Sequence, residues 1–98
     1  MQARDLEADL AICEAATPTR WEHGYSYGAV PYTVVSRGAE DKTIARVFRP
    51  GDARFIAEAR EGWPYAIRRA LEAEAEVDRL RHEIEILREQ LEQRGCCT

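Results

Sequence analysis

Apolar residues near the carboxyl end of the chain recur in alternating steps of three and four, the spacing of a coiled-coil seam. They are Val77, Leu80, Ile84, Leu87 and Leu91. With Val77 set at heptad position a, Ile84 and Leu91 also fall at a, and the remaining two leucines fall at d. β-branched residues at a with leucine at d favour a two-stranded parallel coiled coil.

Charged residues beside this seam indicate how two such helices pair. Glu76 and Glu83 occupy position g, and Arg81 and Arg88 occupy position e. In a parallel pair, g of one chain meets the following e of the other, so both contacts join a glutamate to an arginine. An antiparallel pair would place like charges together. The pattern therefore predicts a parallel homodimer.

Burial of the seam, rather than its charges, would drive this association. Five fully buried seam residues in each chain would contribute roughly 1.5–3 kcal/mol each, on the order of 15–30 kcal/mol per dimer before ordering and association costs. Exposed ion pairs add at most ~1 kcal/mol each. Two alternatives stay open. The stripe could pack on the chain's own N-terminal helix, or Ile86, apolar at the outer position c, could indicate a larger bundle.

The sequence before the seam predicts a small α+β head domain. Leu6, Leu10 and Cys13 lie at helical spacing and predict a helix over residues 4–16, which Thr17-Pro18 ends. Runs rich in β-branched and aromatic residues then predict strands. They cover residues 32–35 and 43–48, and a third strand around Trp21 completes a three-stranded antiparallel meander.

Two further helices are predicted after the sheet. Asp52 is a good N-cap for a short helix over residues 53–61, with Phe55, Ile56 and Ala59 as its apolar stripe and Gly62 as its end. Pro64 then suits the first turn of a long helix that continues to Arg94 and ends at Gly95. The predicted organisation is a head over residues 1–70, a dimerisation helix over 71–94 and a flexible tail over 95–98.

Charge is distributed unevenly along the 98 residues. Residues 1–19 carry a net charge of −3, residues 20–70 carry +3 and residues 71–98 carry −4. Only the middle segment could favour a polyanion. Its basic residues Arg37, Lys42, Arg46 and Arg49 lie among aromatic residues, a combination found in single-strand nucleic-acid binders. A nucleic-acid-binding accessory or regulatory factor using residues 37–69 is therefore the alternative function, although a dimer of an acidic protein is repelled by nucleic acid unless its positive charge clusters on one face.

The interpretation that requires no ligand is that these aromatic residues, Trp21, Phe48 and Trp63, belong to the core.

The sequence offers few candidates for catalytic chemistry. Cys13 and His23 are the only pair that could join a nucleophile to a base, and a buried, inert Cys13 fits its apolar helical face better. His82 falls at the outermost heptad position, f. No motif for phosphate, metal or nucleophilic catalysis is present. We expect no enzyme activity, catalytic residue, metal or cofactor.

Features of the termini and the cysteines bear on location. The chain has no apolar run long enough to span a bilayer, and early acidic residues do not fit a signal peptide. Cys13, Cys96 and Cys97 show no paired spacing, so a reduced, cytoplasmic protein is expected. A parallel dimer would nevertheless bring the Cys96-Cys97 pairs of two chains close enough to oxidise.

Two segments resemble the Ead-like accessory proteins of phages and prophages. Residues 14–21 (EAATPTRW) are similar to the family's Ala-Thr-Pro-Gly-Pro-Trp, and residues 52–60 (DARFIAEAR) to its Asp-Ala-x-Phe-Ile-Ala, which precedes a coiled-coil tail. Thr19 and Arg20 replace the usual Gly-Pro, and Glu61-Gly62-Trp63 also departs from the family pattern. The resemblance implies a small viral or prophage protein of unestablished biochemical role, and it carries no catalytic residue over to this chain. Together with the predicted homodimer, it leads us to expect a non-enzymatic accessory protein that works in the host cytoplasm through protein contacts, with a host or phage protein as the candidate partner.

Overall fold

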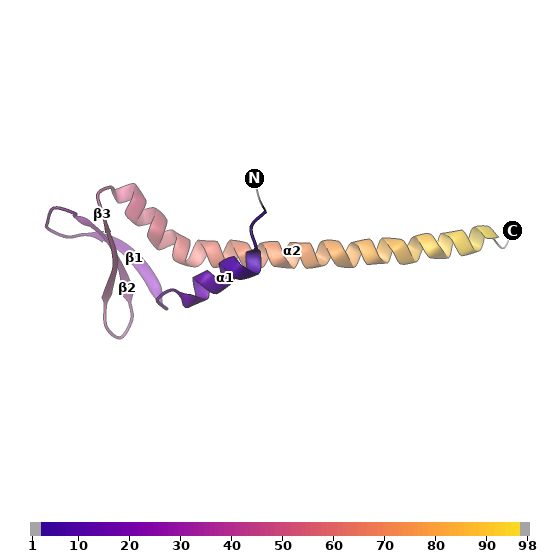
Figure 1. Ribbon diagram of the computed structural model, residues 1–98, viewed down its shortest axis with the longest axis horizontal. Coiled ribbons are helices and arrows are strands. Elements are labelled where there is room, and N and C mark those ends of the chain that lie inside the picture. The colour runs from indigo at the N-terminus through magenta and orange to yellow at the C-terminus, as the bar shows by residue number, and fades with distance from the viewer. Residues whose placement is uncertain (1–2, 97–98) are drawn as a thin grey trace. The chain divides into compact units, whose positions relative to one another are not determined.

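The structure, a computed structural model, describes the backbone of residues 3–96 and the side chains of residues 3–95. The chain divides into two compact units, Met1–Arg68 and Arg69–Thr98. The elements follow the order α1 (Leu6–Ala15), β1 (Arg20–Tyr25), β2 (Tyr32–Arg37), β3 (Lys42–Val47) and α2 (Pro50–Cys96), as Figure 1 shows. The predicted α+β class is confirmed, with a three-stranded antiparallel sheet and a long C-terminal helix.

Helix α1 is capped and braced by acidic side chains. Asp5 is its N-cap, and its carboxylate accepts hydrogen bonds from the backbone N–H groups of Glu7 and Ala8, both at 3.1 Å. Asp9 is buried, yet Arg4 donates two hydrogen bonds of 2.8 Å to its two carboxylate oxygens. This bidentate bond lowers the pKa of Asp9, so the carboxylate stays charged although it is buried.

The strands form a meander in the order β1-β2-β3, as predicted. The β1–β2 register places Trp21 opposite Ser36 and Tyr25 opposite Tyr32. The rings of that tyrosine pair pack edge to face, with 5.6 Å between their centroids. The β2–β3 register shifts between Val34 and Val35, which marks a bulge. A bulge turns successive side chains out of strict alternation. This explains why two consecutive residues, Ile44 and Ala45, both pack against the core.

The core of the Met1–Arg68 unit is small. Val34 from the middle strand is fully buried against Ala53 and Ala57 of α2, one helical turn apart. Alanines at this spacing lie on the same side of the helix, but they contribute little apolar area. Larger side chains are only partly buried around them: Trp21, Tyr32, Ile44, Ala45, Val47 and Ile56. A core of this size makes the unit marginally stable by itself.

The start of α2 corrects two predictions. The helix begins at Pro50, whose fixed φ suits a first helical position, so Asp52 lies in the first turn and is not the N-cap. The prediction that Phe55 belongs to the buried apolar stripe was also wrong. Phe55 is 74% exposed, whereas Ala53 and Ala57 are buried and face the sheet. The buried residues of this segment, Ala53 and Ala57, are instead the small ones that cluster with Val34 of β2.

The predicted break at Gly62 is also wrong, since α2 runs without interruption through Gly62 and Pro64 to Cys96. A proline in a helix interior typically costs about 3 kcal/mol and bends the axis, and glycine costs about 1. Figure 1 shows such a bend in the first third of α2. Pro64 and Ile67 are both buried, and burial on this side offsets part of that cost. The helix likewise continues past Gly95, its predicted end.

Two of the three aromatic residues assigned to the core are not buried. Phe48 is 74% exposed and Trp63 is 38% exposed, whereas Trp21 is half-buried as expected. Phe48 follows the last residue of β3, where neither the sheet nor a buried turn of α2 covers it. Trp63 directly precedes the buried Pro64, but its side chain lies on a different side of α2 from Pro64 and is exposed. The exposed rings therefore form part of the surface of the Met1–Arg68 unit.

Candidate interaction surfaces

The predicted seam is an exposed stripe in the Arg69–Thr98 unit, and we call these five residues the C-terminal seam. Its members are 43–65% exposed: Val77, Leu80, Ile84, Leu87 and Leu91. The described part of this unit consists only of α2, so no other element of the unit covers the seam. Contiguous apolar surface that is left open in this way is typical of an interaction site. Ile86, on another side of the helix, is 40% exposed.

Sequence reasoning missed a charge arrangement beside this seam. Arg79 donates from Nε to Glu76 at 3.0 Å and from Nη1 to Glu83 at 3.2 Å, so it binds both glutamates predicted to direct pairing. The hydrogen bond from Arg79 lowers the pKa of Glu76. Spacings of three and four residues on a helix could have revealed this bridge. In a dimer, Arg79 would compete with Arg81 and Arg88 of the second chain for the same carboxylates.

A second candidate surface is an apolar groove in the Met1–Arg68 unit, and we call it the head groove. Its volume is about 860 Å³, and residues of both α1 and α2 line it. Its apolar lining includes Ile12, Cys13, Phe55, Ile56, Ala59 and Trp63. Ile12 and Phe55 are both more than half exposed, so the groove opens to solvent.

Hydrogen bonds fix the end of the head groove where α1 leads into the sheet. The Thr17 carbonyl accepts hydrogen bonds from Trp21 Nε1 at 3.1 Å and from Arg60 Nε at 3.2 Å. The Arg60 guanidinium also lies over the Trp21 ring, 5.8 Å from its centroid. These contacts join the segment after α1 to β1 and α2 at one point, so hydrogen bonds hold this end of the groove together.

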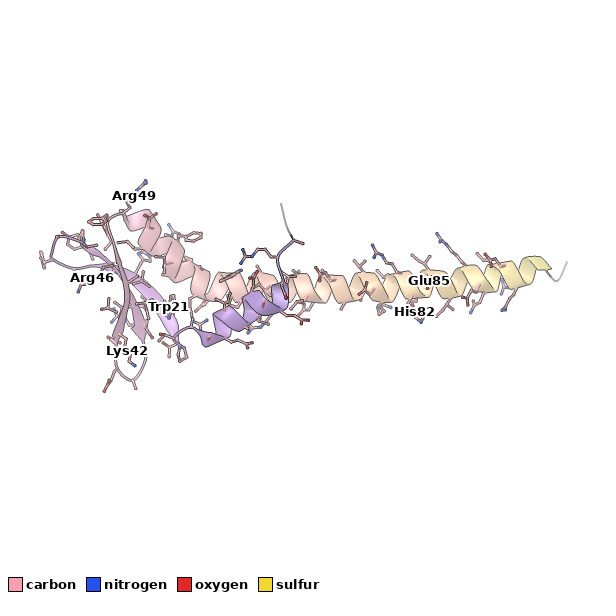
Figure 2. All side chains as sticks on the ribbon, in the orientation of Figure 1. Trp21, Lys42, Arg46, Arg49, His82 and Glu85 are labelled. Carbon is pink, nitrogen blue, oxygen red and sulfur yellow. The ribbon has the colours of Figure 1, made fainter. Side chains whose placement is uncertain are left out.

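The basic residues predicted for nucleic-acid contact do not converge. Arg37 forms ion pairs with Glu22 at 2.9 Å and with Asp41 at 2.7 Å, which neutralise its charge. Figure 2 shows Lys42, Arg46 and Arg49 spread from one end of the sheet to the start of α2. Arg46 donates a hydrogen bond of 3.3 Å to Ser26 Oγ. No concentrated basic patch appears among these four residues.

The candidate nucleophile and base also lie apart. Cys13 is buried and lines the head groove, whereas His23 is exposed and lines a separate, smaller pocket beside Trp21 and Glu58. His82 is exposed on α2 (Figure 2). The Cys96 side chain and Cys97 lie outside the described residues. Among those that are described, no group of three or more histidine, cysteine or acidic side chains is placed to hold a metal ion.

Comparisons with known proteins give no relative. No protein-family description matches the chain, and neither a characterised protein nor a solved structure is detectably similar to it. Within residues 3–96, no helix has both the length and the apolar character needed to cross a bilayer. The two apolar surfaces are the main structural features on which a function can be proposed.

Proposed function

We propose that this chain is a non-enzymatic interaction module that works as a parallel homodimer through the C-terminal seam. The observation that carries the proposal is the exposure of all five seam residues on a helix whose g and e positions are oppositely charged. Side chains from Val77 to Leu91 would meet their own copies in alternating a and d layers.

The exposures set the strength of this association. Scaling ~1.5–3 kcal/mol for full burial by the exposed fractions gives about 4–8 kcal/mol per chain, or about 8–15 per dimer. Association costs an estimated ~4–15 kcal/mol, so the gain and the cost are of similar size. The seam alone supports a weak dimer, whose population rises with concentration.

Sedimentation of the full chain across a concentration series tests the proposal. The expected result is a shift from 11.2 kDa to twice that mass as concentration rises. A single 11.2 kDa species at every concentration would contradict a dimer and would favour a seam covered by the chain's own helix α1. A mass of three or four chains would indicate a larger bundle, in which the exposed Ile86 would supply an additional apolar contact.

We infer further that the module is an accessory protein of a phage or prophage, which acts in the host cytoplasm on a host or phage protein. The sequence resemblance supports this. Thr19 has a φ of +85°, a conformation that glycine adopts readily and a β-branched residue rarely does. The turn before Trp21 is thus compatible with the glycine that the family has at this position. Capture by the tagged dimer from infected cells, compared with a monomeric variant, tests for a partner that requires the dimer.

A further inference from the structure

The heptad register of the C-terminal seam continues toward the start of α2. Counting back from Val77 in steps of four and three gives six earlier a and d positions, all of them on α2. Every one is apolar: Ile56, Ala59, Trp63, Ala66, Ala70 and Ala73. With hydrophobic residues at 45% of the chain, chance would fill six such positions in roughly 1 case in 100. The heptad pattern of apolar a and d positions thus extends in the sequence from Ile56 to Leu91, across the bend in the first third of α2.

The first three of these positions lie in the head groove. Ile56, Ala59 and Trp63 line the groove together with Ile12 and Cys13 of α1. They are distinct from Ala53, Ala57 and Ile67, which are buried within their own unit. Ile56 also packs against the core, so packing within the unit accounts for that position, but it does not account for Trp63, which is 38% exposed. A partner with the same heptad register would bury Trp63 as well.

We propose that the head groove is occupied by the same segment of a second copy of this chain, so that Trp63 of each chain packs against Trp63 of the other. This inference rests on the proposed dimer and extends its interface. Trp63 has alanine at the d position on either side, Ala59 and Ala66, which leaves room for two indole rings. The contact is self-complementary, as twofold symmetry requires.

Energetics and charge both favour this occupant. The C-terminal seam alone gains about as much as association costs, so a stable dimer needs additional apolar contact. At the next flanking positions, Arg69 falls at g and Glu74 at e, a third complementary pair in a parallel, in-register dimer. Sliding one chain by a heptad would place Arg69 against Arg81, or Glu76 against Glu74. The charge order therefore selects the register that brings the two grooves together.

Disulfide trapping in the full chain tests this interface. The parent protein carries Cys96→Ser and Cys97→Ser, so its one remaining thiol is the buried Cys13, and cross-linking of this parent gives the background rate. Ala66→Cys introduces a thiol at a d position, and Arg68→Cys introduces a matched thiol at the outer position f. Under mild oxidation we expect Ala66→Cys to form a covalent dimer at least tenfold faster than Arg68→Cys. The masses of both proteins before oxidation are measured by sedimentation.

These two readouts separate the possible failures. If both variants sediment as dimers and cross-link equally slowly, the extended interface is wrong and the C-terminal dimer stands. If both sediment as monomers, the proposed function fails as well.

A second variant removes the indole without adding a thiol. Trp63→Ala should weaken the dimer about 100-fold, whereas Phe48→Ala, which truncates another exposed ring at a position outside α2 and its heptads, should leave the dissociation constant within about twofold. Equal effects of the two variants on the dissociation constant would overturn the proposed contact.

Discussion

Placing lysine at both d positions of the C-terminal seam should abolish the dimer. Leu80 is 43% exposed and Leu87 is 56% exposed, so together they present about one full leucine side chain per chain for burial. That amounts to ~1.5–3 kcal/mol per chain, or about 3–6 per dimer, before any repulsion between ammonium groups. At ~1.4 kcal/mol for each factor of ten, Leu80→Lys with Leu87→Lys should weaken the dimer by roughly 10²- to 10⁴-fold.

The assay is analytical ultracentrifugation of the parent and the variant at matched concentrations, with circular dichroism to check helix content. Lysine and leucine have similar helix propensities, so any loss of mass should not reflect loss of helix. The matched control is His82→Lys with Gln93→Lys, which adds the same two lysines at the outer positions f and c. The control should sediment as the parent does.

The reasoning is refuted if the Leu80→Lys, Leu87→Lys variant keeps the parent's dissociation constant while its helix content is unchanged. The dimer interface would then lie elsewhere on the chain. Loss of the dimer in the control as well would indicate that added positive charge, rather than loss of the apolar layers, disrupts association. A variant that keeps its dimer mass but loses helix would also contradict the packing described for the seam.

Three other predictions concern the Met1–Arg68 unit. Asp5→Ala removes the cap of α1 and should lower the free energy of unfolding by about 1 kcal/mol in urea titration, while Asp5→Asn keeps an acceptor oxygen and should cost only a few tenths. Because Arg4 lowers the pKa of Asp9, this carboxyl should leave the melting temperature unchanged above about pH 4 and should lower it as the pH falls through the lowered value. Arg4→Gln removes the cause of the lowered pKa, so the acid-dependent fall due to this carboxyl should disappear, and identical profiles would contradict the assigned ion pair. Labelled single-stranded DNA or RNA should show no retardation at low salt; a salt-dependent shift that Arg46→Ala removes would restore the nucleic-acid alternative.

Elements that depend on local patterns could be predicted from the sequence. Strands β2 and β3 follow from β-branched and aromatic runs bounded by turn residues, whereas the strand around Trp21 is predicted only because it completes a meander. The N-terminal helix follows from the spacing of Leu6, Leu10 and Cys13. The heptad likewise fixes which side of α2 is apolar, because periodicity is a property of the sequence alone.

The errors occur where tertiary packing decides between local options. Helix 53–61 has two apolar sides, and no periodicity argument shows that the side with Ala53 and Ala57, rather than Phe55, faces the sheet. Gly62 and Pro64 are strong local signals for a break, yet burial around Ile67 keeps α2 continuous. The head groove was missed for a related reason. Its lining comes from two helices distant in sequence, and only the upstream heptad positions give a sequence signal for it.

Disulfide trapping at the last a position of the seam tests the parallel dimer most directly. In the Cys96→Ser, Cys97→Ser parent, Leu91→Cys places both thiols in one layer of a parallel pair, whereas Gln93→Cys, on the outer side, serves as control. Antiparallel pairing centred on Ile84 would separate the Leu91→Cys thiols by roughly 20 Å along the axis, far beyond the reach of a disulfide. We expect rapid covalent dimer formation by Leu91→Cys alone; a Leu91→Cys protein that stays uncrosslinked while sedimenting as a dimer would contradict parallel pairing.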